Sequence, residues 1–492
     1  MPGPPDSNLK PRGDSLPASF WVLLIGTPLL TLLVTAVAGV LFMGSCARVF
    51  IRVLLNRPIS DTLAELFVSA LSTPPLELLY LSLRSAKGDV IIRPMGSPKP
   101  RLGFDAVTLV PAQLARRPAS TWEEADLRVQ LGPRARRPLH LALPMFVSGM
   151  AYGLALSREA RLALAEGAKL AGTALNSGQG PFFEEERRRA GAYILQFGRW
   201  KWNRSPEVLA AADMIEIQVG QGAMPGNAVL STPASITDEV RELMHLAPGE
   251  PPTIHANLFL GDDPHDIATL AEVVAYLRRE TPDIPLAVKM GAGHELEADL
   301  DVALDAGVDV IVIDGTEGAT GNAPITLSDH FGLPSLVALS RARRHLERQG
   351  AVGRVDLVIS GGFREPGDVL KAVAMGAKAV GLGTAAMFAI AHEHITAAVP
   401  FHPPTDLVFA KTAHQIPINP HAGAKGLANY LESCRREMAI ALKAMGHTSL
   451  SELSLADLAT LSDDIAAWTG IAHAGRAGER PLGMVGACAK EG

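Results

Sequence analysis

The stretch VISGGFREPGDVLKAVAMGAKAVGLGTA, residues 358–385, contains two short apolar runs separated by about the length of one helix. Glycines end both runs, at 361–362 and again within 381–384. The segment between them, 365–376, has a proline near its start and a glycine at its end, which is typical of a helix. A strand, a helix and a second strand in this order predict a parallel pair joined by a crossover helix.

Six similar runs precede this unit, and most are followed by a helical segment such as Ser157–Gly172. The eight runs are HLALPMFVSG (140–149), TALNSG (173–178), YILQFG (193–198), MIEIQVG (214–220), PLAVKMG (285–291), VIVIDG (310–315), LVISGG (357–362) and AVGLGT (379–384). Continuous apolar strands that alternate with helices indicate a parallel sheet covered on its outer face. Eight of them favour an α/β fold of the (β/α)8 TIM barrel type over an open doubly wound sheet.

The remaining sequence surrounds this expected barrel. The four expected segments are an N-terminal tail with a single transmembrane anchor (1–60), a linker or N-terminal cap (61–138), the barrel (139–400) and a C-terminal helical extension (401–492). Within the extension, helices are expected near Gly423–Met445 and Ser454–Trp468. A further strand is expected at 255–263, in a long connection over the barrel mouth.

The N-terminal region contains a long uncharged stretch. Phe20–Gly44 is a run of 25 mostly apolar residues, and a helix of that length would cross a hydrocarbon layer of roughly 30 Å. A signal peptide has an apolar region of about 7–15 residues, which is shorter. Arg48, Arg52 and Arg57 follow the run, so the distribution of positive charge places the large C-terminal part in the cytoplasm. The expected location is the cell inner membrane, crossed once.

Charge and cysteine content exclude several classes of protein. The formal net charge of −6 gives no reason to expect a nucleic-acid partner. The cysteines Cys46, Cys434 and Cys488 are three in number and far apart, so neither a disulfide framework nor a CxxC metal motif is expected.

The glycines of the last two strands predict a phosphate site. In barrels of this class, the loops after strands seven and eight often hold a phosphate through exposed backbone N–H groups and a helix N-terminus. A single glycine-rich turn is more often only a tight connection. Two consecutive ones, at Gly361–Gly362 and Gly383–Thr384, favour phosphate binding.

Polar residues at other strand ends suggest which molecule carries the phosphate. Lys289 ends strand five, where a cation can stabilise negative charge on a reduced flavin, although a lone lysine there is more often an ion-pair partner. Asn176 and Gln196 end strands two and three and offer the amide hydrogen bonds that a flavin pyrimidine ring needs. The turn SGMAYG, 148–153, adds backbone near the flavin N5. Together these residues predict an FMN site.

Several longer stretches agree with motifs of one family. In chain order they are SGMAYGLALSREARLALAEGAKLAG, LNSGQG, IEIQVGQGAMPG, DGTEGATGNAP, HFGLP and SGGFREPGDVLKAVAMGAKAVGLGTAAM, within about residues 100–390. This sequence resembles the FMN-binding synthase domain of glutamate synthases, including its short single-domain relatives. The resemblance implies an FMN-dependent oxidoreductase in which a hydride from reduced flavin reaches an imine carbon and forms an amino acid.

The resemblance also implies roles for individual residues. The expected FMN-binding set is Ser148, Gly149, Met150, Ala151, Asn176, Gln196, Lys289, Gly361, Gly362, Gly383 and Thr384. The expected catalytic set is Lys289 as stabiliser of flavin charge, Gln221 as substrate-orienting group, and Asp314 or Glu317 as proton relay. Asp314 is equally well explained as a turn residue.

Other features of the family are missing from this sequence. Met1 leads into the apolar stretch instead of a glutaminase domain, so glutamine hydrolysis is not expected. Residues 387–404 contain no cysteines for the family's iron–sulfur cluster. His392, His394 and His402 lie in that region, but no convincing carboxylate or cysteine ligand accompanies them, and no metal is expected.

The substrate region also departs from the family. EIQVGQGAMPG stands where the family usually has EIKxxQGAKPG, so Gln218 and Met224 replace two lysines while Gln221 remains. Gln179 occupies a position that is typically glutamate. Because a dicarboxylic oxo acid needs cations around it, the substrate is either less acidic than 2-oxoglutarate or held by other basic residues.

These observations support one leading function and one alternative. The leading function is reductive amination of a 2-oxo acid, 2-oxoglutarate or a related acid, by free ammonia or an amine, with electrons from a separate reductase. The alternative is a membrane-tethered FMN-binding protein with a different substrate or no glutamate synthase activity. An inosine-monophosphate dehydrogenase would need a barrel cysteine, and residues 140–400 contain none. A 2-hydroxyacid oxidase is disfavoured, because it would have a histidine base and paired arginines after the late strands, and His330 and Arg364 lack that spacing.

Overall fold

The computed structural model of the chain describes residues 26–56, 63–120, 124–222, 236–252, 269–318, 320–321, 323–394, 405–410 and 416–476. The expected strand at 255–263 and residue Met224 lie outside these described residues. The chain divides into two compact units, Met1–Ile91 and Ile92–Gly492.

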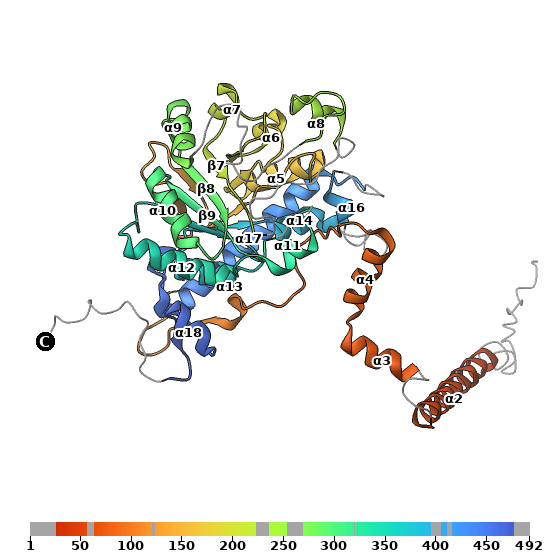
Figure 1. Cartoon of the computed structure of the whole chain (residues 1–492). Coiled ribbons are helices and arrows are strands. Elements are labelled where there is room, and N and C mark those ends of the chain that lie inside the picture. Colours follow the sequence, from red (N-terminus) through yellow and green to blue (C-terminus); the bar gives the residue numbers. More distant parts are fainter. Residues whose placement is uncertain are drawn as a thin grey trace, which may run out of the picture. The chain divides into compact units, whose positions relative to one another are not determined.

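The second unit is built on a closed barrel of eight parallel strands, as the sequence predicted (Figure 1). Its strands are β4 (Met145–Val147), β5 (Ala174–Asn176), β6 (Ala192–Phe197), β7 (Met214–Gln218), β8 (Leu286–Gly291), β9 (Val310–Asp314), β10 (Asp356–Ser360) and β11 (Ala379–Leu382). They follow chain order, and β11 closes the barrel by pairing with β4, where Leu382 lies beside Val147. Nearly every strand residue is buried, which explains why the strands appear in the sequence as continuous apolar runs.

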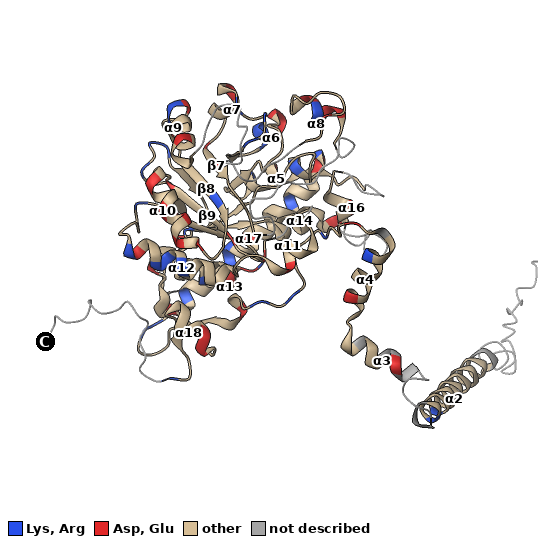
Figure 2. Cartoon of the chain, in the orientation of Figure 1, with Lys and Arg blue, Asp and Glu red and all other residues tan. Residues whose placement is uncertain are grey.

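Helices cover the outside of the barrel. They are α5 (Arg158–Leu170), α6 (Glu184–Arg189), α7 (Pro206–Ala210), α8 (Asp238–Leu243), α9 (Leu270–Glu280), α10 (Leu296–Ala306), α11 (Ile325–His330), α12 (Ser335–Arg348), α13 (Pro366–Ala374) and α14 (Thr384–Ala391). The Ser157 side chain caps α5 by accepting a hydrogen bond from the Ala160 N–H. Charged residues of both signs lie on these outer helices (Figure 2).

The first predicted barrel strand, 140–149, is two strands in the structure. Residues Leu139–Leu141 form β3, which pairs antiparallel with β2 (Val129–Leu131), and the barrel strand β4 begins only after Pro144. The β2–β3 hairpin lies at the amino ends of the barrel strands, since the Gly132 N–H donates a hydrogen bond of 2.8 Å to Asp356 Oδ2 at the start of β10. Proline cannot donate to a strand ladder, so the run divides at that residue.

The C-terminal residues pack against the barrel. Helix α17 (Pro420–Ala444) lies against α5, α13 and α14, and the short helix α16 (Thr405–Val408) precedes it. The helix expected at 454–468 does not form as one element. Those residues instead make a 3-10 turn, the strand β12 (Leu458–Thr460) and the helix α18 (Asp463–Thr469). Strand β12 lies between β1 (Val107–Leu109) and β13 (Ala472–His473), and this tertiary pairing overrides the local helical pattern.

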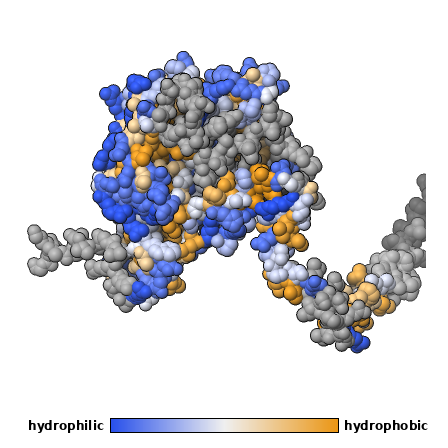
Figure 3. Space-filling view, in the orientation of Figure 1, coloured by the Kyte–Doolittle hydropathy of each residue, from blue (hydrophilic) through white to orange (hydrophobic). Residues whose placement is uncertain are grey.

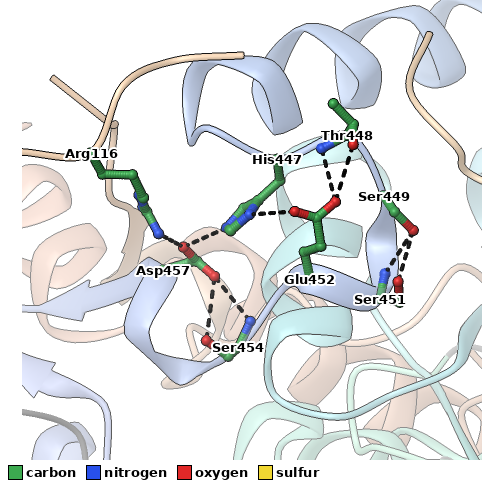
Figure 4. A network of polar contacts seen from close by, with 8 residues as sticks. All are labelled: Arg116, His447, Thr448, Ser449, Ser451, Glu452, Ser454 and Asp457. Atoms are coloured by element: carbon green, nitrogen blue, oxygen red, sulfur yellow. Dashed lines mark hydrogen bonds and ion pairs between the residues drawn. The ribbon is translucent and has the colours of Figure 1, made fainter. Parts of the chain in front are cut away.

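A buried carboxylate links this C-terminal region to the segment before the barrel (Figure 4). Asp457 accepts hydrogen bonds from Arg116 Nη1 at 2.7 Å and from the Ser454 N–H at 3.0 Å, and its Oδ1 lies 2.9 Å from His447 Nε2. Burial by itself raises the pKa of Asp457, but the contacts with His447 and Arg116 outweigh it and hold that pKa below its ordinary value. The network therefore fastens the two ends of the unit to each other.

The first unit contains three described helices, α2 (Thr27–Asn56), α3 (Leu63–Ser72) and α4 (Pro75–Lys87). Within α2, Leu29–Val53 is long and apolar enough to cross a membrane, and none of it is buried against other parts of the protein. Almost no charge lies along α2 (Figure 2), and apolar side chains are exposed along α4 (Figure 3). The described span starts later in the chain than the predicted run at 20–44, whose residues 20–25 lie outside the described part.

Candidate active site

A cavity of about 390 Å³ opens at the carboxyl ends of the barrel strands. Every site residue predicted from the sequence lines it except Asn176; the lining residues among them are Ser148, Gly149, Met150, Ala151, Gln196, Gln221, Lys289, Asp314, Glu317, Gly361, Gly362, Gly383 and Thr384. Parallel strands of a barrel all end at the same face, so residues far apart in sequence meet there.

Lys289 is the buried cation of the cavity. It lies in β8, it is only 5% exposed, and it lines the cavity wall. Within the part of the chain that the structure describes, its Nζ makes neither a hydrogen bond nor an ion pair. Because a buried ammonium without a partner is costly, this position favours an anionic or strongly polar ligand in the cavity.

Asn176 lies behind the cavity wall in a row of buried polar side chains. Its Nδ2 donates to Glu216 Oε1 at 2.9 Å, and its Oδ1 accepts from the Gly178 N–H at 2.9 Å. Gln196 Nε2 donates to the same Glu216 oxygen at 2.8 Å. Glu216 was not among the predicted site residues, although a glutamate inside an apolar strand run, IEIQ, is a signal for a buried polar partner.

Glycine is required where the turn after β4 approaches this row. A Cβ at Gly149 would lie 2.9 Å from both Asn176 Oδ1 and Gln196 Nε2, which is closer than real Cβ contacts come. Any larger residue would displace the two amides. The turn 148–151 therefore runs directly against the polar row.

The glycine loops after β10 and β11 leave backbone open to the cavity. Gly361 has a φ of 106°, which L-residues rarely adopt, and it lines the cavity with Gly362. Gly383 precedes the first turn of α14, and a Cβ placed on it would meet no atom within 4 Å. Gly383 and Thr384 line the cavity, so the positive end of the α14 dipole lies at the cavity, where it favours a phosphate group.

Asp314 ends β9 and Glu317 lies on the loop after it, in different surroundings. Asp314 Oδ1 accepts from Ser360 Oγ at 2.5 Å and its Oδ2 accepts from the Gly222 N–H at 3.0 Å, so this carboxylate ties three strand-end loops together. Glu317 Oε2 accepts from the N–H and the Oγ of Ser335, at 2.9 and 2.8 Å. Burial raises the pKa of Glu317 despite these bonds. Its raised pKa suits Glu317 to holding a proton.

The altered substrate motif is only partly inside the cavity. Gln221 lines the cavity wall, whereas Gln218 is fully buried behind it. The Gln218 Oε1 accepts from Gln196 Nε2 at 3.1 Å, and its Nε2 donates to the Gly220 carbonyl at 3.2 Å. Gln218 therefore supports the cavity wall from behind and does not line the cavity. The family's usual lysine at this position would place a charge there. Gln179 lines the cavity, and its backbone carbonyl accepts a hydrogen bond from Trp202 Nε1 at 3.0 Å.

A buried ion pair supports the turn after β4. Arg161 on α5 is fully buried, and its Nε lies 2.6 Å from Glu186 Oε2 on α6. Its Nη1 donates to the backbone carbonyl of Met150 at 2.6 Å, and its Nη2 donates to the backbone carbonyl of Asn176 at 3.1 Å. The sequence did not indicate this role, because an arginine in an amphipathic helix ordinarily faces solvent.

A segment that precedes the barrel contributes one further wall of the cavity. Met95 lines the cavity with a φ of 68°, an unusual conformation for a residue other than glycine. The surrounding strap, residues 92–101, is fastened to α11: Arg93 forms an ion pair with Asp329, and Ser97 Oγ donates to Asp329 at 2.6 Å. The strap's contacts thus hold Met95 in a strained conformation that the chain alone would disfavour.

The histidines near the end of α14 do not form a metal site in the described structure. His392 and His394 lie in a 3-10 turn, and His402 lies outside the described residues. Among the described residues there is no group of three or more His, Cys, Asp or Glu side chains placed to hold a metal ion.

A family model and similar sequences point to one family. The model of the conserved region in glutamate synthase matches residues 120–448. A glutamate synthase large subunit-like protein from Rhizobium meliloti (strain 1021) is 33% identical over 80% of this chain and 92% of its own length. An archaeal-type glutamate synthase [NADPH] from Thermotoga sp. (strain RQ2) is 29% identical over 77% of this chain and 78% of its own length. Among solved structures, a flavocytochrome b2 mutant with benzoylformate is 17% identical, has a TM-score of 0.47, and aligns over 74% of this chain and 78% of its own.

Proposed function

The chain belongs to the glutamate synthase family, and from this premise we propose that it is an FMN-dependent oxidoreductase that aminates a 2-oxo acid. The observation that carries the proposal is that one cavity is lined by two open glycine loops and by the buried Lys289, which has no partner among the described residues. The lysine and the loops are suited to two anionic parts of one molecule, a reduced flavin ring and a phosphate.

The residues present fit FMN. The Gly361–Gly362 loop and the N-terminus of α14 at Gly383 and Thr384 would hold the phosphate. Gln196 and Lys289 would face the pyrimidine edge of the ring. When bound, reduced FMN supplies a hydride equivalent, while the chain supplies orientation and charge.

The proposed net reaction joins a 2-oxo acid, ammonia, two electrons and two protons to give a 2-amino acid and water. Glu317, whose pKa is raised by burial, lines the cavity and would hold one of the two protons that this reaction consumes. Gln221 would orient the substrate by hydrogen bonds from its amide. The contacts of Asp314 with Ser360 and Gly222 favour a role in holding loops over a role in proton transfer.

The test uses the full-length chain purified in detergent. We expect an oxidised flavin spectrum, and we expect the flavin, once reduced anaerobically, to be reoxidised by 2-oxoglutarate plus ammonia faster than by either compound alone. A colourless protein that does not take up added FMN would refute the cofactor assignment. A yellow protein that no 2-oxo acid reoxidises would refute the reaction and leave FMN binding standing.

One observation supports an alternative with a less acidic substrate. Gln218 is committed to hydrogen bonds inside the wall, and Met224 replaces the other lysine of the family motif. A dicarboxylate would therefore meet fewer cations here than in the family pattern. Reoxidation by a monocarboxylic 2-oxo acid such as pyruvate, at a rate at least tenfold above that with 2-oxoglutarate, would favour this alternative.

We also propose that electrons come from a separate reductase. The only cysteines are Cys46, Cys434 and Cys488, so the chain lacks the thiolates that an iron–sulfur cluster requires. Anaerobic incubation with NADPH alone should leave the flavin oxidised, and addition of a low-potential donor such as dithionite should reduce it. Direct reduction by NADPH would contradict this assignment.

Helix α2 is proposed to anchor the protein in the inner membrane, with the barrel in the cytoplasm. The support is the apolar span Leu29–Val53 and the arginines that follow the predicted run. Replacing Val37 and Leu41 by arginine costs about 2.5–3.5 kcal/mol for each residue at a membrane centre, and should move the protein to the soluble fraction. An intact mass that lacks the first 40 to 50 residues would instead identify the segment as a cleaved signal sequence.

A further inference from the structure

We propose that Glu216 is a positioning residue that fixes the direction of the buried amide row, so that Gln196 presents a hydrogen-bond acceptor, and not a donor, to the flavin pyrimidine ring. This inference rests on FMN being the cofactor, as proposed above. It assigns a role to a side chain that does not itself line the cavity.

The position of Glu216 in the barrel supports this role. The residue lies in β7, is 1% exposed, and has Gln196 beside it in the neighbouring strand β6. Both of its hydrogen bonds in the row end on Oε1, from Asn176 Nδ2 and Gln196 Nε2. The Glu216 oxygen accepts both bonds, so both amides turn their NH2 groups toward it.

The hydrogen bonds of Gln196 then leave only one atom for a ligand. Its Nε2 carries two hydrogens and makes two bonds, to Glu216 Oε1 at 2.8 Å and to Gln218 Oε1 at 3.1 Å. Its Oε1 accepts no hydrogen bond from any described residue, and the side chain lines the cavity. Gln196 therefore offers the cavity an acceptor.

This polarity complements the flavin ring. The pyrimidine edge presents one N–H donor, at N3, between two carbonyl acceptors. A Gln196 acceptor and the Lys289 donor can satisfy this alternating pattern. A reversed Gln196 would present its NH2 and leave N3–H without a partner, and an unmade hydrogen bond in a buried site is costly.

The hydrogen bonds of Gln218 run in the same donor-to-acceptor direction toward Gln221, the predicted substrate-orienting residue. Gln218 Nε2 donates to the Gly220 carbonyl and lies 3.5 Å from Gln221 Oε1. This leaves the NH2 of Gln221 for the cavity. Gln218 thus extends the row of hydrogen bonds that starts at the Glu216 carboxylate and passes through Gln196 to Gln221.

The test measures binding of FMN and of N3-methyl-FMN, which lacks the N3–H donor, to the FMN-free full-length protein by flavin fluorescence. The unaltered protein should bind FMN about tenfold or more tightly than the methyl analogue. Glu216→Gln supplies an NH2 in place of a carboxylate oxygen, lets the row reverse, and should reduce the ratio below threefold. The exposed Glu207→Gln serves as the matched control and should keep the full ratio.

Gln196→Met removes the acceptor itself and gives a second test if Glu216→Gln does not fold. It should also reduce the ratio below threefold. A full ratio in either folded variant, or equal binding of both flavins by the unaltered protein, would overturn the inference. If the ratio behaves as expected but no 2-oxo acid reoxidises the flavin, the role of Glu216 stands while the proposed reaction fails.

Discussion

Replacing Lys289 by methionine should stabilise the FMN-free protein and weaken its binding of FMN. The side chain is 5% exposed, and no described residue accepts a hydrogen bond from its Nζ. Among the described residues nothing offsets the desolvation cost of this cation, so we expect a ligand to offset it. Methionine has a similar length and no charge, so it removes that cost without leaving a large cavity.

The two effects have opposite signs and similar sizes. The desolvation penalty of a buried ion in a real protein is several kcal/mol. Water that reaches the cavity solvates the ammonium and reduces this penalty. We expect Lys289→Met to raise the free energy of unfolding of the FMN-free protein by about 1–3 kcal/mol. Loss of a hydrogen bond from a charged group costs about 1.5–3 kcal/mol, which corresponds to FMN binding about ten- to a hundredfold weaker.

Urea unfolding followed by circular dichroism, with and without excess FMN, measures both effects on the full-length chain. FMN stabilises the folded state according to its concentration relative to Kd, so the FMN-induced shift of the midpoint should shrink in the variant. Lys425→Met is a matched control, because Lys425 is exposed on α17 and the two residues have similar helix propensity. An FMN-free Lys289→Met protein that is less stable than the unaltered protein would refute the reasoning.

Three further substitutions test other contacts of the site. Burial raises the pKa of Glu317, so the stability that this group contributes is present below the ordinary glutamate pKa and is lost as pH rises through the raised pKa. In thermal melts, the Glu317→Gln variant should therefore be more stable than the unaltered protein at pH 8 but not at pH 4. A difference in stability that does not depend on pH would contradict this. Glu186→Gln leaves Arg161 buried without a counter-ion and should lower the free energy of unfolding by about 3–5 kcal/mol in urea, whereas a loss below 1 kcal/mol would show that the pair is dispensable. Asp329→Asn should loosen the strap and speed hydrogen exchange around Met95 at least threefold by mass spectrometry; unchanged exchange would show that the ion pair does not hold the strap.

The sequence predicted the barrel because buried parallel strands leave a strong local signal. The predicted runs at 285–291 and 310–315 differ from β8 and β9 by only one residue at one end. The predictions failed where non-local contacts decided the element. The run at 140–149 is divided between a hairpin and a barrel strand, and residues 458–460 pair with β1 instead of continuing a helix.

The site was predictable to the extent that barrel topology brings strand ends together. All the predicted site residues except Asn176 line one cavity, because they lie near or just after the carboxyl ends of the barrel strands. Asn176 has the expected position along its strand, but its amide is turned toward Glu216. No spacing in the sequence specifies which of two neighbouring polar groups a side chain will meet.

The sequence by itself determined the barrel, the positions of the polar strand ends and the family, since each depends on local pattern and on motif order. Tertiary structure alone decided which polar groups face the cavity and which support it. Glu216 and Gln218 lie two residues apart on one strand, and both are buried behind the wall, whereas Gln221 reaches the cavity. The physical reason is that burial without a partner is costly, so each polar side chain turns toward the groups that the fold places beside it.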